Sequence, residues 1–140
     1  MKIEQQKKNI VKWINKKYPE LGKLKELSKF NTGQSNPTYR LNFENEILVL
    51  RSKPEGKLLR GAHRIDREFR VMSCLYNTKI PVPKMKAYCE DINIIGREFY
   101  IMEFMDGIQE VDPILKTIPS NKKKQLYYNK LDILINLGQL

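Results

Sequence analysis

The residue types best suited to chemistry in this 140-residue chain are those that bind and orient a phosphate group. They occur in a polar loop at 31–37, at the cationic end of an apolar run at 46–54, and in a helical pattern at 63–75. In such a loop a glycine can take positive φ, and side chains and successive backbone N–H groups can donate to an anion. Because the loop lacks the G-x-x-x-x-G-K-[ST] pattern of a P-loop, an ordinary polar turn is the alternative. The candidate residues are Gly33, Gln34, Ser35 and Asn36.

A cation at the end of the apolar run could neutralise phosphate charge. A strand here would place Val49, Arg51 and Lys53 on one face and Leu48 and Leu50 on the other. The planar fork of arginine can hold a phosphate through two hydrogen bonds. Lys53 competes for the same role two residues later, and strand-end cations that only face water are the alternative.

Glu68 is the candidate partner of this cation. It lies one residue before Phe69, at the border of the apolar face of the predicted helix, and could point toward the strand that carries Arg51. A partly buried carboxylate there would need a cation to offset its desolvation. The alternative is a surface glutamate with Arg64 and Arg70 as local partners. The apolar face consists of Ile65, Phe69, Met72 and Leu75.

Metal and nucleophile chemistry have few candidate residues. His63 is the only histidine, and Cys74 and Cys89 form no C-x-x-C motif. So few soft ligands cannot build a zinc site, and a nucleophile–histidine pair would depend on His63 alone. We expect both cysteines to be buried thiols, because their segments are typical of helix and strand.

The hydrophobic pattern predicts one compact lobe followed by the start of another. Pro19 ends the first helix, and the prolines at 81 and 83 prevent the central helix from continuing. Ser120 is the predicted N-cap of a final helix, which runs to the chain end. That helix carries Tyr127, Leu131, Leu134 and Ile135 on one side. The predicted elements are a helix at 3–18, strands at 24–30, 39–43 and 47–51, a helix at 63–75, strands at 84–89 and 97–105, and a helix from 120.

The net charge of +10 is concentrated where it does not favour nucleic-acid binding. Residues 1–29 contain nine lysines and three glutamates, on a segment whose Ile3, Ile10, Ile14 and Tyr18 share one helix face. The lysines therefore occupy the solvated face. No apolar run reaches the ~20 residues that span a bilayer, and the N-terminus lacks the apolar core of a signal peptide. We expect a globular cytoplasmic protein with neither nucleic acid nor membrane as partner.

Residues 99–107, FYIMEFMDG, follow the loop, strand and helix in the order found in kinase-like folds. Together these segments resemble the aminoglycoside-phosphotransferase-like family, most closely the branch fused to acyl-CoA dehydrogenases. The resemblance implies an α+β fold: a kinase-like small lobe at 1–105, with a twisted antiparallel sheet and a packed helix. Residues 106–140 would leave the hinge and form the first helix of a large lobe that is truncated.

The same resemblance implies ATP as the ligand. Residues 33–39 match the family's Gly-x-Ser-Asn-x-x-Tyr phosphate loop, with Thr32 where a first glycine is usual. Arg51 would hold the phosphates and Glu68 would hold Arg51. Met102 would lie at the back of the adenine pocket, while the Glu103 C=O and the Met105 N–H would meet the adenine edge.

The family's His-Gly-Asp catalytic loop and its metal ligands do not occur in this sequence, so catalytic residues and Mg²⁺ ligands are expected downstream of Leu140. The full reaction would transfer the γ-phosphoryl group of ATP to a hydroxyl group. The acceptor stays open between an aminoglycoside, a sugar or amino alcohol, and a hydroxyacyl compound, which the resemblance favours. The fragment itself is expected to be inactive. The alternatives are a non-catalytic binding module with the same lobe and a basic nucleic-acid-binding domain.

Overall fold

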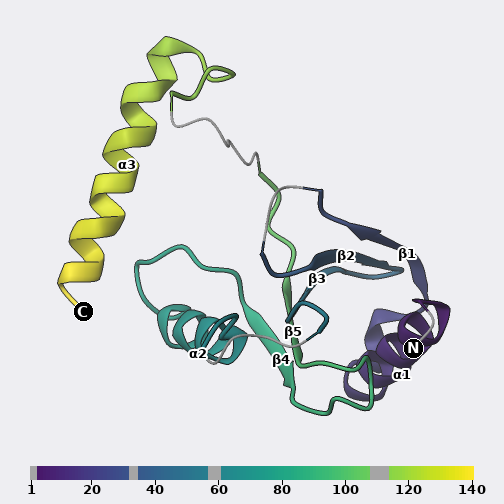
Figure 1. The fold of residues 1–140 in the computed structure, drawn as a ribbon. Coiled ribbons are helices and arrows are strands. Elements are labelled where there is room, and N and C mark those ends of the chain that lie inside the picture. Colours follow the sequence, from purple (N-terminus) through teal and green to yellow (C-terminus); the bar gives the residue numbers. More distant parts are fainter. Residues whose placement is uncertain (1–2, 32–34, 57–60, 108–113) are drawn as a thin grey trace.

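The structure, a computed structural model, describes residues 3–31, 35–56, 61–107 and 114–140. Five strands and two of the helices form the body of the fold, and a further helix follows near the C-terminus (Figure 1). The elements are α1 (Ile3–Lys17), the short 3₁₀ helix η1 (Pro19–Leu21), β1 (Leu24–Lys29), β2 (Thr38–Phe43), β3 (Ile47–Ser52), α2 (Ile65–Leu75), β4 (Met85–Cys89), β5 (Phe99–Glu103) and α3 (Ser120–Gly138).

The strands pair in the order β1-β2-β3-β5-β4, and every pairing is antiparallel. β2 and β3 form the predicted hairpin, whereas β5 inserts between β3 and β4. This insertion places Arg51 of β3 opposite Thr38 on one side and opposite Tyr100 on the other. The predicted α+β fold with an antiparallel sheet is confirmed.

One face of the sheet carries the hydrophobic core beneath α1. Ile10 and Ile14 of α1 are buried in this core, and the Trp13 ring meets Phe99 edge-on at 5.1 Å between centroids. Ile3, in the first turn, is 81% exposed and lies outside the core. Burial of each large apolar side chain contributes about 1.5–3 kcal/mol. The sheet contributes Leu41, Phe43, Leu48, Leu50, Phe99 and Ile101.

The opposite face of the sheet is covered in part by α2, so the two helices lie on opposite sides of the strands (Figure 1). Phe69 of α2 packs its ring 5.5 Å from that of Tyr88 and 5.8 Å from that of Tyr100. Successive side chains of a strand point to opposite faces of the sheet, so Tyr100 faces α2 while Phe99 and Ile101 face the core beneath α1.

Two sequence predictions are wrong in detail. Cys74 is exposed, because it lies off the apolar face of α2, whereas Cys89 is buried as predicted. Ser120 is the first residue of α3 rather than its N-cap; Pro119 occupies that position, and no side chain caps the helix.

α3 stands apart from the sheet in Figure 1, and none of its described residues is buried. The predicted stripe formed by Tyr127, Leu131, Leu134 and Ile135 is exposed by 47–58%. In the described part of the chain, no helix combines the length and apolar character needed to cross a bilayer.

Candidate functional site

A cleft of about 410 Å³ lies beside the end of β5. Val49 of β3 and Met102 of β5 project into it from the sheet face that α2 covers in part, and the chain that leaves β5 forms one wall. Cavities of this size suit a small organic ligand. The remaining lining comes from Phe30, Thr38, Pro83, Glu103, Phe104, Met105, Asp106 and Gly107.

The walls of the cleft offer apolar surface for a flat ligand. Phe104 is held by Arg40, whose guanidinium lies 4.8 Å from the ring centroid. This cation–π contact fixes the aromatic ring, while Val49 and Met102 supply aliphatic surface from adjacent strands. The arrangement can accept an uncharged planar group between side chains of opposite walls.

The backbone after β5 adds directional groups to these walls. Phe104 donates its N–H to Ile47 C=O, so the neighbouring Leu48–Glu103 pair is a non-hydrogen-bonded pair of the antiparallel ladder. The backbone N–H and C=O of Glu103 therefore point away from β3. The Glu103 N–H donates to Lys84 C=O at 3.0 Å, and the Lys84 N–H donates at 2.8 Å to the Glu103 carboxylate. The Lys84 N–H is therefore engaged by the Glu103 side chain, and within the described ranges no group accepts a hydrogen bond from the Met105 N–H.

Arg51 is held in place at the side of this cleft. Its Nε lies 2.9 Å from Oε2 of Glu68, and its Nη1 donates to Oγ1 of Thr38 at 3.0 Å. Thr38 also lines the cleft, so the ion pair and the cleft share a residue. The predicted pairing of Arg51 with Glu68 is therefore present.

The Glu68 carboxylate receives hydrogen bonds on both oxygens. Oε2 accepts from Arg51 and from the Tyr100 hydroxyl at 3.1 Å, and Oε1 accepts from Nδ2 of Asn36 at 3.2 Å. Burial, followed by the charge of Glu68, raises the pKa of the Tyr100 phenol well above its usual range. Tyr100 therefore remains a donor at physiological pH, and the carboxylate is well satisfied.

Asn36 does not lie as the phosphate-loop prediction implied. It is 3% exposed, and its amide points at Glu68 and His63 rather than outward. Ser35 is exposed beside it. Gly33 and Gln34 lie outside the described residues.

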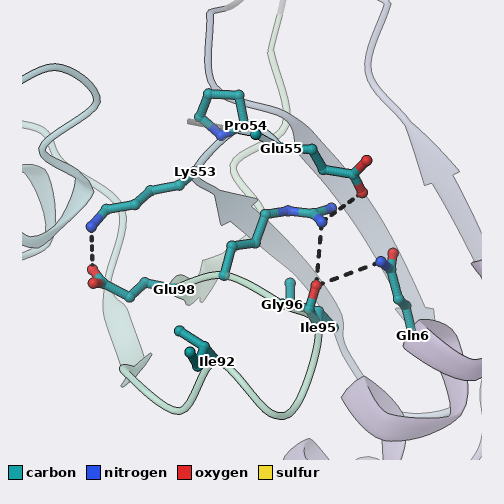
Figure 2. A pocket seen from close by; sticks show the side chains of 10 residues that line it. Gln6, Lys53, Pro54, Glu55, Ile92, Ile95, Gly96 and Glu98 are labelled. Atoms are coloured by element: carbon teal, nitrogen blue, oxygen red, sulfur yellow. Dashed lines mark hydrogen bonds and ion pairs between the residues drawn. The ribbon is translucent and has the colours of Figure 1, made fainter. Parts of the chain in front are cut away.

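Lys53, the competing cation, points to a different place. Its Nζ lies 2.7 Å from Oε2 of Glu98 (Figure 2). The same oxygen also accepts a hydrogen bond from the Tyr88 hydroxyl. Burial tends to raise the pKa of the Glu98 carboxyl, but the hydrogen bonds from Lys53 and Tyr88 outweigh it and hold that pKa below its usual range. Arg97, the residue before Glu98, forms an ion pair with Glu55 at 2.8 Å, so these charges link the segments that follow β3 and precede β5.

Sequence reasoning missed three members of the network around Glu68. Tyr100 and Thr38 flank Arg51 on neighbouring strands, a relationship that depends on the pairing register. The sequence presents His63 only as a possible ligand or nucleophile partner, whereas in the structure its Nδ1 lies 2.6 Å from Oδ1 of Asn36. The only signal available was its position two residues before the helix that carries Glu68.

The described residues offer no cluster of metal ligands. In the ranges that the structure describes, no group of three or more His, Cys, Asp or Glu side chains could hold a metal ion. Arg51 supplies a positive charge beside the cleft, held by Glu68 and Thr38.

A strand cation paired with a helix glutamate beside an edge cleft is the arrangement of the small lobe in kinase-like phosphotransferases. Comparison with known proteins agrees with this class. A family model described as the phosphotransferase enzyme family matches residues 26–138, and the chain belongs to this family.

Relatives and a solved structure support the same assignment. The chain is 47% identical over 102 residues to acyl-CoA dehydrogenase family member 10 of Mus musculus and 39% identical over 114 residues to family member 11 of Rattus norvegicus. These matches cover 73% and 81% of this chain but only 10% and 15% of those proteins. A crystal structure of a Ralstonia eutropha protein assigned as an aminoglycoside phosphotransferase is 33% identical, with a TM-score of 0.73. That match covers 96% of this chain and 38% of the solved one.

Proposed function

We propose that this chain is the ATP-binding lobe of a phosphotransferase that phosphorylates a hydroxyl group. The observation that carries the proposal is the Arg51–Glu68 ion pair, which is joined through Thr38 to a cleft with apolar walls. Phosphoryl transfer depends mainly on positioning and on charge compensation, and an oriented arginine supplies both. Membership of the phosphotransferase family supports this reading.

Each part of the cleft has a role in the proposal. The adenine would lie between Val49, Met102 and Phe104, with its edge toward the Glu103 C=O and the Met105 N–H. The phosphates would lie toward Arg51, covered by the loop that contains Gly33, Gln34 and Ser35. Glu68 would keep the guanidinium of Arg51 oriented before the nucleotide arrives.

The metal ion, the second lobe and the acceptor are proposed for a whole protein of which this chain would be one part. The chain spans 38% of the length of the solved relative, and its described residues contain no group of three or more His, Cys, Asp or Glu side chains that could hold a metal ion. Bound magnesium would neutralise charge on the transferring phosphate. We assign residues 1–105 to the nucleotide-binding lobe and 106–140 to the start of the helical lobe. The names of the curated relatives favour a hydroxyacyl acceptor over an aminoglycoside or a sugar.

Titration of the ¹⁵N-labelled chain with ATP tests the proposal. Amide shifts should concentrate at 102–106 and around Arg51, at ligand concentrations that reflect weak binding by one lobe. Adenosine alone should move only the signals at 102–106, and tripolyphosphate alone should move those near Arg51. Shifts spread evenly over the surface, or confined to the lysines of α1, would contradict nucleotide binding at this cleft.

A further inference from the structure

His63 holds an uncommon backbone conformation two residues before α2. Its φ is 55°, in the left-handed region that side chains with a Cβ rarely adopt. Its carbonyl accepts a hydrogen bond from the Ile65 N–H at 2.9 Å, and its ring Nδ1 lies 2.6 Å from Oδ1 of Asn36. Backbone strain of this kind persists only where the surroundings fix it. The fold therefore holds the imidazole against Asn36.

The Glu68 carboxylate determines which atoms donate in this chain of contacts. An ionised carboxylate only accepts, so Asn36 must turn its Nδ2 toward Glu68, as the 3.2 Å contact shows. The Oδ1 of the same amide then faces His63. Because Oδ1 is an acceptor, a contact of 2.6 Å requires a donor, and the proton must lie on Nδ1 of His63.

We infer that His63 is a positioning residue for the proposed nucleotide cleft, because its Nδ1–H fixes the amide of Asn36, which holds the Glu68 carboxylate that orients Arg51. The effect on phosphate binding rests on the proposed function. The direction of the hydrogen bonds from His63 through Asn36 to Glu68 does not depend on the proposed function, because it follows from the contacts within the chain.

Burial makes this arrangement sensitive to the imidazole. Asn36 is 3% exposed, so water has little access to its amide. Without the donor on His63, the Oδ1 of Asn36 loses its hydrogen bond to the imidazole, and of these two partners only the Glu68 carboxylate still holds the amide in place. A flipped amide would turn its oxygen toward the Glu68 carboxylate, and two acceptors would then repel. Glu68 would retain Arg51 and Tyr100 as donors but would be held less tightly in place.

The tautomer of the ring is the first test. The chain contains a single histidine, so long-range ¹H–¹⁵N correlation of the imidazole is unambiguous. At alkaline pH, without nucleotide, the neutral ring should carry its proton on Nδ1. A proton on Nε2 would overturn the inference, whatever the affinity for ATP.

Substitutions at His63 provide the second test, read from the Nε–H signal of Arg51, which is assigned by its loss in Arg51→Lys. His63→Asn keeps a donor close to the Nδ1 position and tolerates left-handed backbone, so that signal should stay sharp and slow to exchange. His63→Ala and His63→Gly both remove the donor, and the signal should broaden or exchange faster. His63→Gly also relieves the backbone strain, so it remains informative if His63→Ala fails to fold.

Affinity for ATP links the inference to the proposed function. His63→Gly should weaken ATP binding by about threefold to tenfold, and His63→Asn should restore it. An Arg51 Nε–H signal that is unchanged in both His63→Ala and His63→Gly would overturn the positioning role. Absence of ATP binding by the unsubstituted chain, with the Nδ1–H tautomer intact, would overturn the proposed function instead.

Discussion

Arg51 and Tyr100 face each other across β3 and β5, and both donate a hydrogen bond to the same carboxylate oxygen of Glu68. One donor is charged and the other is neutral, so Glu68 is compensated without a second cation. The pairing of two strands and the packing of α2 on the same face are both needed to bring these three side chains together. The site is therefore a product of the tertiary fold and not of any one segment.

The two strand-end cations should differ sharply in their effect on nucleotide binding. Arg51→Ala removes a charged donor at the cleft and should weaken ATP binding by about tenfold to a hundredfold. The free energy of unfolding should fall by only about 1–2 kcal/mol, because Glu68 keeps Tyr100 and Asn36 as donors. Isothermal titration calorimetry and urea unfolding measure the two effects.

Lys53→Ala is the matched control, since it removes one positive charge two residues away from Arg51 but breaks a pair with Glu98. Its affinity for ATP should stay within about twofold of the original chain. The opposite result, with Lys53→Ala damaging and Arg51→Ala silent, would show that the phosphate-facing cation is assigned two residues too early. In a longer homologue the same pair of variants should separate phosphoryl transfer from folding.

The Tyr100 hydroxyl should contribute to the order of Glu68 and little to the core. Tyr100→Phe keeps the ring that packs on Phe69 and removes one neutral donor, so the free energy of unfolding should fall by about 1 kcal/mol. The Arg51 Nε–H signal should remain, because the ion pair persists. A loss above about 3 kcal/mol would mean that the hydroxyl has a larger structural role than one hydrogen bond allows.

The elements could be predicted from the sequence because their patterns are local. The period of Ile10 and Ile14 in α1, and of Ile65 and Phe69 in α2, predicts helices whose inner faces the structure confirms. Arg51 and Glu68 could be predicted as partners from their positions on these elements together with the family resemblance, because position alone left Lys53 and the local arginines as alternatives. The prediction for Cys74 was wrong because it was based on the segment being helical, although the helical period places Cys74 off the apolar face of α2.

The rest of the site depends on contacts between distant segments. Thr38 and Tyr100 flank Arg51 only because β5 inserts between β3 and β4, and no local pattern specifies that register. Asn36 is a polar residue of a type common in exposed loops, yet it is buried against Glu68, which is 32 residues later in the sequence. The roles of Gly33 and Gln34 stay predictions, as do those of Met102, Glu103 and Met105 toward adenine.

Acid should destabilise the chain in part through Glu98. Its pKa in the folded state lies below that of an unfolded glutamate, so its stabilisation is present above the unfolded value and is lost as pH falls through the folded one. Glu98→Gln should therefore unfold more easily than the original chain at neutral pH. The difference should shrink as pH falls below the ordinary glutamate range, which urea unfolding at a series of pH values measures. A difference that grows with acidity would contradict the direction of this pKa.

The exposed stripe of α3 should make the chain associate at high concentration. Leu131, Leu134 and Ile135 are each more than half exposed on one side of the helix, and contiguous apolar surface of this kind drives association. The net charge of +10 opposes this effect, but six of those charges lie within residues 1–29. At physiological salt the Debye length is only about 8 Å, so charge on α1 protects α3 little.

Leu131→Glu should shift the chain toward monomer in size-exclusion chromatography with light scattering, because it breaks the stripe with a charge. Asn129→Glu is the matched control, since it adds the same charge to α3 without removing apolar surface, and it should leave association nearly unchanged. Removal of residues 120–140 should act like Leu131→Glu and leave the strands folded, because no residue of α3 is buried against them. If the original chain is a clean monomer with slow hydrogen exchange throughout α3, the stripe must pack on the chain's own surface, and the exposed position of α3 is then wrong for the protein in solution.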